Sequence, residues 1–518
     1  MKKNILIFSL LLFFLGNSGF LAVFAQEMPL SEADLQKKVF FFDLKKALKN
    51  PQEVYKLDLS KQNLKEFPKE ILQLKQLHVL ILANNQLRDL PSEIAELQWL
   101  QILNVSQNYL QYLPQNINQL AHLQTLNLSR NRIDSLPNQL LQLKKLRYLW
   151  LEENQIRKIP TLDSLEAIEE ILLSRNKIFQ LPAQWKQCKH LKIIDLSYNQ
   201  LIQLPEGFGE MPQLEKIMLN NNALVALPKS LALCAELKEL YCQNNQLTQL
   251  PENIGQLKKI ERLQASFNQI TSLPESIKTC MQLQALNLEN NHFSTFPSTA
   301  LLAPALTVLD LANNQIKTLT INVPNEKLFF LNLTHNQLDS LKGDIANIKA
   351  LKDLFLSHNK IKYIDNAIGS LQGLETLYLD DNQLAVFPEN IATLTRLKTL
   401  LLTQNMLNEV PKTLLNLTQL EVLELSMNKL TTLPKNINQM AKLTFLGITD
   451  NAIAVLPANF YKLTNLQELH LSNNKISTMD KNIGEMKKLQ KIILINNTIS
   501  AEEQQKIKSL LPNAMIAF

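Results

Sequence analysis

The segment Leu77-His78-Val79-Leu80-Ile81-Leu82-Ala83-Asn84-Asn85-Gln86-Leu87 determines how this chain folds. It has the pattern LxxLxLxxNxL, in which Leu80 and Leu82 alternate with Val79 and Ile81. Alternation with a period of two is typical of a short strand with one face in the core and the other facing outward. The segment therefore predicts a short strand whose leucines are buried, followed at Asn85 by a turn.

The same pattern recurs through most of the chain. Its asparagine returns from Asn85 to Asn497 in steps of 23 residues, except for steps of 22 residues at 154–176 and 314–336. An earlier copy has Gln62 at this position, so about 20 repeats cover residues 52–499. One repeat cannot bury its own apolar stripe, but stacked repeats bury it together. The repeats predict a solenoid rather than the several globular domains that 518 residues would otherwise suggest.

Two further features of the repeat predict structural roles. A buried asparagine can hydrogen-bond the turn backbone of its own repeat and of the next, so we interpret the asparagine column as structural. Each asparagine is followed by LxxLPxxIxxL, in which proline favours an extended start and then one or two helical turns on the convex face.

The proline of the LP step is replaced in four repeats, at Thr320, Lys342, Asp365 and Asp480. Because three of these replacements are consecutive and lie beside the short step at 314–336, we expect an irregular loop or a change of curvature there.

Both ends of the repeat array carry segments that can cover its core. Residues 26–51 form the predicted N-terminal cap, in which Ser31 and Asp34 begin a helix that stops near Pro51. Residues 500–518 form the predicted C-terminal cap, in which Ser500 precedes a helix over 501–511 and a strand follows at 515–518. Neither cap is large enough to be a catalytic domain.

The first 25 residues have the features of a secretory signal peptide. Lys2 and Lys3 precede an apolar run over residues 5–15, and small residues at Val23 and Ala25 favour cleavage before Gln26. The alternative is an uncleaved anchor, for which the run is short. We therefore predict an exported protein that is secreted, held at the cell surface or periplasmic, with no transmembrane segment in the mature chain.

The net charge indicates which classes of binding partner to expect, and the spacing of the cysteines indicates whether disulfides stabilise the fold. Without residues 1–25 the chain has 51 basic and 47 acidic residues, a balance that favours neither nucleic acid nor anionic membranes as partners. Cys188, Cys234 and Cys280 recur every 46 residues, and Cys242 replaces a strand leucine. Positions two repeats apart are separated by about 10 Å, beyond the reach of a disulfide. We expect four buried thiols that pack as small hydrophobic groups.

With its LxxLxLxxNxLxxLPxxIxxL repeat, the sequence resembles the leucine-rich repeat proteins over about 450 residues. The LP step is similar to that of the Ras-group repeats, and the signal peptide with small helical caps is similar to secreted bacterial members. The resemblance implies an α/β solenoid: a horseshoe with a parallel concave sheet, short helical turns on the convex side and helical caps. It implies recognition of proteins on the concave face and no reaction. The absence of cysteine-rich caps argues against an animal receptor.

The sequence gives little support for a catalytic site or a metal site. It contains no GxxxxGK[ST], HExxH, GxSxG or CxxC motif, so we expect no enzyme activity and no cofactor. His335, His358 and Asp381 precede the asparagine in three consecutive repeats and should form a ladder with rungs about 5 Å apart. Imidazole and carboxylate are ligands for transition metals, but an exposed polar edge explains the same residues. We favour the second interpretation and predict no metal site.

Partner binding is predicted from apolar residues on the outward strand positions, which are otherwise mostly polar. Exposed aromatic clusters on a rigid face are typical interface anchors, although a few aromatic residues arise by chance among so many repeats. The N-terminal patch consists of Tyr148, Trp150, Leu172, Tyr198, Met218 and Tyr241. The C-terminal patch consists of Phe330, Phe355, Tyr378 and Leu401.

We therefore expect a protein-binding scaffold, most simply a monomer, that recognises a protein or peptide partner on its concave face. The alternative is a structural or adhesive surface protein that self-associates or binds envelope glycans, because asparagine, aspartate and tyrosine on the concave face also suit a sugar.

Overall fold

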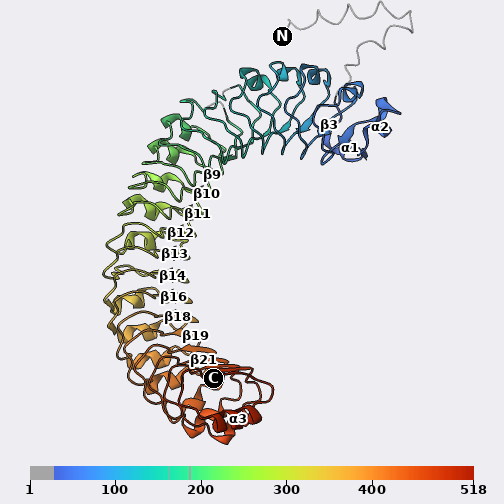
Figure 1. The fold of residues 1–518 in the computed structure, drawn as a ribbon. Helices are drawn as coiled ribbons and strands as arrows, with labels where there is room; N and C mark the ends of the chain where they lie inside the picture. Colours follow the sequence, from blue (N-terminus) through green and yellow to red (C-terminus); the bar gives the residue numbers. More distant parts are fainter. Residues whose placement is uncertain (1–28, 163, 186–187) are drawn as a thin grey trace, which may run out of the picture.

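The structure is a computed structural model that describes residues 29–162, 164–185 and 188–518, so the signal peptide predicted at 1–25 lies outside the described residues. The chain forms one curved solenoid with its strands on the inner side and short helical turns on the outer side (Figure 1). Within the described ranges, none of the helices has the length and apolar character that a membrane span requires.

A parallel sheet of 22 strands lines the concave face of the described chain. Each strand pairs in register with the strand of the next repeat, so that Leu240, Leu263 and Leu286 lie side by side. Two other strands, β15 (Ser340–Leu341) and β17 (Tyr363–Ile364), form a small separate sheet. The strands of the large sheet are β1 (Phe40–Phe41), β2 (Lys56–Asp58), β3 (Val79–Ile81), β4 (Ile102–Asn104), β5 (Thr125–Asn127), β6 (Tyr148–Trp150), β7 (Glu170–Leu172), β8 (Ile193–Asp195), β9 (Lys216–Met218), β10 (Glu239–Tyr241), β11 (Arg262–Gln264), β12 (Ala285–Asn287), β13 (Val308–Asp310), β14 (Phe330–Asn332), β16 (Asp353–Phe355), β18 (Thr376–Tyr378), β19 (Thr399–Leu401), β20 (Val422–Glu424), β21 (Phe445–Gly447), β22 (Glu468–His470), β23 (Lys491–Ile493) and β24 (Met515–Ala517).

The convex side carries single turns of 3-10 helix, which confirms the helical turn expected after the LP step. In most of them proline immediately precedes the first helical residue, as Pro91 precedes Ser92–Glu96. The 3-10 helices are Pro51–Glu53, Lys69–Gln73, Ser92–Glu96, Ile117–Gln119, Asn138–Gln142, Glu206–Gly209, Lys229–Leu233, Ile254–Gln256, Glu275–Thr279, Ser298–Leu302, Gly343–Asn347, Asn366–Ser370, Glu389–Thr393, Lys412–Asn416, Ile437–Gln439, Ala458–Lys462 and Lys481–Glu485.

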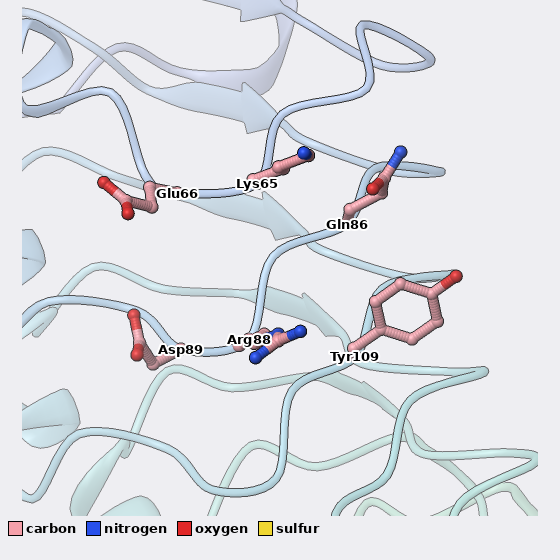
Figure 2. Close-up of a pocket in the computed structure, with 6 residues that line it drawn as sticks. All are labelled: Lys65, Glu66, Gln86, Arg88, Asp89 and Tyr109. Atoms are coloured by element: carbon pink, nitrogen blue, oxygen red, sulfur yellow. The ribbon is translucent and has the colours of Figure 1, made fainter.

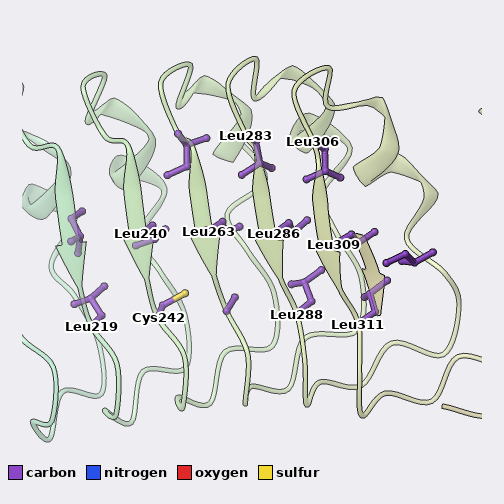
Figure 3. Packing of buried hydrophobic residues seen from close by; sticks show 14 of the residues in the cluster. Leu219, Leu240, Cys242, Leu263, Leu283, Leu286, Leu288, Leu306, Leu309 and Leu311 are labelled. Atoms are coloured by element: carbon purple, nitrogen blue, oxygen red, sulfur yellow. The ribbon is translucent and has the colours of Figure 1, made fainter. Parts of the chain in front are cut away.

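The leucines of the repeat form one continuous apolar core. Figure 3 shows how equivalent residues stack in rows, with Leu240, Leu263, Leu286 and Leu309 behind the strands. All four are at most 1% exposed. Cys242 occupies a leucine site in the next row, where burial raises the pKa of its thiol to about 12. All four cysteines are buried, as expected from their phase in the repeat.

The asparagine column closes the turn of every repeat. Asn268 is 6% exposed. Its Nδ2 donates to the carbonyls of Ala265 and Ser266 in its own repeat, at 3.1 and 3.0 Å, and to that of Cys242 in the preceding repeat, at 3.0 Å. Its Oδ1 accepts from the backbone N–H of Leu247, at 2.9 Å. The expectation of a bond to the next repeat was wrong: the side chain joins its own repeat to the preceding one.

The residue before each asparagine has a left-handed backbone. Its φ lies between 48° for Asp381 and 57° for Asn84 across these repeats. Non-glycine residues rarely adopt this conformation, although Asn, Asp and His tolerate it best. The side chains of these residues therefore form a ladder along one edge of the concave face, and this ladder contains His335, His358 and Asp381.

The stretch in which Thr320, Lys342 and Asp365 replace the proline of the LP step departs from the regular repeat, as expected. No 3-10 helix lies between β13 and β14, a stretch that the structure describes in full. In the following two repeats, β15 and β17 pair on the outer side, and the N–H of Asp365 donates to the carbonyl of Leu341 at 2.8 Å. Proline at position 365 would have no N–H to donate, so its absence permits this extra pairing.

The two caps differ in how well they match the sequence pattern. At the C-terminus, α3 (Ala501–Leu510) and β24 follow Ser500 as expected. At the N-terminus the single predicted helix is instead two short helices, α1 (Glu32–Gln36) and α2 (Leu44–Ala47), separated by β1. Residues 40–41 pair with β2, which would otherwise be an uncovered edge of the sheet. The covering of this edge explains why the helix is interrupted.

Candidate partner-binding surface

The concave face offers three columns of outward side chains. In each repeat they come from the first and third residues of the strand and from the residue two positions farther on. In the repeat of β18 these are Thr376, Tyr378 and Asp380, which are partly exposed, whereas Leu377 and Leu379 between them are buried. Because the strands are in register, equivalent positions form rows that run along the whole sheet.

The N-terminal patch lies on β6 to β10 but is not continuous. Trp150 lies opposite Leu172, and Met218 lies opposite Tyr241, in the third-residue column. Asp195 separates the two pairs. Tyr148 lies in the first-residue column, with its ring centroid 6.5 Å from that of Trp150.

Tyr198 lies outside this group of strand residues. It is in the turn after β8, with a φ of 55°, and its ring lies 4.2 Å from the guanidinium carbon of Arg175. Its side chain is therefore part of the edge ladder rather than of the strand surface.

Polar contacts hold the aromatic residues of the N-terminal patch in place. The indole Nε1 of Trp150 donates to Oε1 of Glu170 at 2.6 Å, and the hydroxyl of Tyr241 donates to Glu239 at 3.1 Å. Burial alone would raise the pKa of Glu239, but hydrogen bonds from Lys216 and Tyr241 outweigh it, and the pKa is lowered. These anchors are thus positioned before any partner arrives, which reduces the entropy lost on binding.

The C-terminal patch is a continuous aromatic cluster. The ring centroids of Phe330 and Phe355 are 5.2 Å apart, and Phe355 and Tyr378 meet edge to face at 4.8 Å. Leu401 lies opposite Tyr378 on the neighbouring strand. All four side chains are partly exposed.

The edge ladder contains the candidate metal ligands. The imidazole rings of His335 and His358 stack in parallel with centroids 4.0 Å apart, and Nδ1 of His358 lies 2.8 Å from Oδ2 of Asp381. Burial and the neighbouring His358 lower the pKa of His335. Across the described ranges of the chain, no group of three or more His, Cys, Asp and Glu side chains could hold a metal ion.

Two hollows in the described surface lie on the flank of the solenoid, in the loops that follow the strands. Figure 2 shows one of about 470 Å³, formed by loops after three successive strands and lined by Lys65, Glu66, Gln86, Arg88, Asp89 and Tyr109. Its charged side chains are all exposed. A second hollow, of about 520 Å³, is lined in part by Phe179 and Ile202, which are 43% and 57% exposed. Neither was anticipated from the sequence, although Phe179, Ile202 and Val225 occupy one position in three consecutive repeats.

The register, the stacked leucines and the asparagine column define a leucine-rich repeat solenoid. Comparison with family models finds leucine-rich repeats at residues 99–156, 121–178, 166–224, 326–384 and 395–453, and further single repeats at 236–257 and 465–486. The chain belongs to the leucine-rich repeat family. No curated protein sequence matches it significantly.

Solved structures of similar fold include bacterial and plant proteins. A leucine-rich repeat protein of Leptospira interrogans is 32% identical, with 93% of this chain and 100% of that chain covered and a TM-score of 0.54. The plant peptide hormone receptor RGFR1, in complex with RGF2, is 28% identical over 91% of this chain and 79% of that chain, with a TM-score of 0.71. YopM from Yersinia enterocolitica shares the fold at 24% identity, over 88% and 90% of the chains, with a TM-score of 0.67.

Proposed function

We propose that this chain is an exported scaffold that binds a protein or peptide partner on the concave face of its solenoid. The observation that supports this most directly is the C-terminal patch, in which Phe330, Phe355 and Tyr378 form a contiguous aromatic cluster on a sheet face open to solvent. Soluble proteins rarely leave such clusters uncovered unless a partner binds them. The complex of the similar plant receptor with a peptide hormone supports the same use of the fold.

The sheet is suited to binding because it is rigid. Each strand of the large sheet from β2 to β23 is held by neighbours on both sides, and the turns after these strands are closed by hydrogen bonds across repeats. A preformed surface loses little conformational entropy when a partner docks, so the binding energy of a few aromatic anchors is retained. The N-terminal patch would supply a second set of anchors on the same face.

Capture with the mature chain tests this proposal. Residues 26–518 would be immobilised and exposed to surface and secreted proteins of the producing organism and its surroundings. We expect retention of a partner that is lost when Trp150→Ala and Tyr378→Ala are combined, because this variant removes one anchor from each patch.

The control variant combines Tyr112→Ala and Tyr363→Ala, which removes two aromatic residues that are 57% and 53% exposed outside the concave columns. It should retain the partner fully. If both double variants retain the partner equally, the aromatic residues of the concave face do not form the binding surface.

A further inference from the structure

The concave face is acidic at its centre. From β6 to β21, the three outward columns contain nine carboxylates and only two basic residues, Lys216 and Arg262. Both basic residues lie close to one carboxylate, that of Glu239, at 3.0 and 3.6 Å. The other eight carboxylates are those of Glu152, Glu170, Asp195, Glu289, Asp310, Asp353, Asp380 and Glu424.

This acidity contrasts with the chain as a whole, which has a formal net charge of +6. The residues outside this part of the concave face therefore have a net positive charge. A face of one sign on a protein of the opposite sign attracts a complementary partner to that face in particular.

Four of these carboxylates surround the C-terminal patch. Asp353 lies opposite Phe330 in the first-residue column, and Glu424 lies opposite Leu401 in the third-residue column. Asp380 follows Tyr378 by two residues on the same face, and Asp310 is separated from Phe355 by Asn332 alone.

Among the described residues, hydrogen-bond donors rather than cations contact three of these four carboxylates. Asp310 accepts from the N–H of Ala312 and from Asn332, and Asp380 accepts from Ser357 and from the N–H of Thr403. Glu424 accepts from the N–H and hydroxyl of Ser426. In the part of the chain that the structure describes, no lysine or arginine forms an ion pair with any of the four.

Two basic side chains next to the C-terminal patch come from residues that immediately precede strands. Lys352 immediately precedes Asp353 and is exposed, and Lys398 is 2.6 Å from Glu375. Burial raises the pKa of Asp310, and burial together with the negative charge of Asp310 raises the pKa of Glu289. These carboxylates would be better stabilised by an added cation than they are in the free protein.

We propose that the C-terminal patch binds a partner segment in which lysine or arginine alternates with apolar residues; this inference rests on the proposed function. Aromatic faces attract cations, arginine most often, and carboxylates beside them accept their hydrogen bonds. The apolar side chains of the segment would contact Phe355, Tyr378 and Leu401, while its cations would reach Asp353, Asp380 and Glu424.

The spacing of the strands gives the length of such a segment. Neighbouring strands are about 4.8 Å apart, so the four strands β14, β16, β18 and β19 extend over roughly 14 Å. An extended chain advances about 3.3 Å per residue, so about five residues span the C-terminal patch. The distance from β6 to β19, which includes both patches, corresponds to about 16 residues by the same spacings.

A random 16-residue peptide library selected on the mature chain tests this inference. We expect enrichment of Lys and Arg beside apolar residues. We expect binding of the enriched peptides to fall about tenfold in the variant that combines Asp353→Asn with Asp380→Asn, because two of the complementary charges are lost. Neither substitution changes the shape of the side chain much, so the fold should be retained.

The matched control combines Glu389→Gln with Glu409→Gln, which removes two exposed carboxylates outside the concave columns. The control should bind the enriched peptides as the native chain does. Equal loss in both variants would mean that only net charge matters and would overturn the inference. Failure to enrich any peptide would also count against it.

The proposed function can survive failure of this inference. Enriched peptides that lack Lys and Arg, but whose binding is lost with Tyr378→Ala, would overturn the basic partner and leave the concave site standing. Peptides unaffected by Tyr378→Ala and by both aspartate substitutions would show that binding lies elsewhere, and the proposed function would then fail as well.

Discussion

Replacement of Asn268 by alanine should lower the free energy of unfolding by about 3 kcal/mol. The substitution removes a side chain that is 6% exposed and makes four hydrogen bonds to the backbone of two repeats. The N–H of Leu247 and the carbonyl of Cys242 would lose these bonds inside the protein, where water does not replace them easily. Each buried polar group left without a partner costs about 1–3 kcal/mol.

Urea unfolding followed by circular dichroism measures this loss. Gln269→Ala is the matched control, because Gln269 is the next residue, is exposed, and bonds the preceding repeat only through its backbone N–H. The control should leave the midpoint of unfolding nearly unchanged. Equal midpoints for the two variants would mean that the asparagine column does not join the repeats.

Replacement of Trp150 by alanine should weaken binding of the captured partner by about 2 kcal/mol, which is about 30-fold in Kd. Tryptophan is among the residues that most often dominate interface energies, and Glu170 already holds this indole in place. Because Trp150 faces outward, its loss should have little effect on folding. Titration calorimetry with the native chain and the variant measures the difference.

Tyr112→Ala serves as the control for a general effect of losing an exposed aromatic residue. An unchanged Kd for correctly folded Trp150→Ala protein would remove the N-terminal patch from the binding site. It would leave the C-terminal patch as the remaining candidate.

The fold could be predicted almost completely from the repeat, because local spacing determines it. A period of two around Leu80 and Leu82 gives the strand, and the proline of the LP step gives the start of each outer turn. Burial of the cysteines follows from their phase. These inferences needed contacts only between neighbouring repeats, whose geometry the sequence repeats many times.

Features that depend on contacts with one particular neighbouring segment of the chain were harder to predict. Phe40 and Phe41 form a strand because β2 needs an edge partner, and a helical pattern in the cap does not reveal this. The direction of the asparagine bonds depends on which neighbouring repeat its turn faces. Tyr198 lies beyond the end of β8, where alternation no longer tells which way a side chain points.

The candidate site was predicted only in its apolar part. The patches were found from aromatic residues, whereas Asp353 and Asp380 were not singled out as candidate site residues. Adding up the charges of the three concave columns, separately from those of the flanks, would have found the acidic centre. That separation requires knowing which residues share a face, which the register of the strands provides.

Site-specific photo-crosslinking gives the most direct test of binding on the concave face. A benzophenone amino acid would replace Asn287, on β12 between the two patches, or Leu233, which is 59% exposed on the convex side. With the captured partner present, we expect a cross-link from position 287 and none from position 233. A cross-link from position 233 alone would contradict recognition by the concave face.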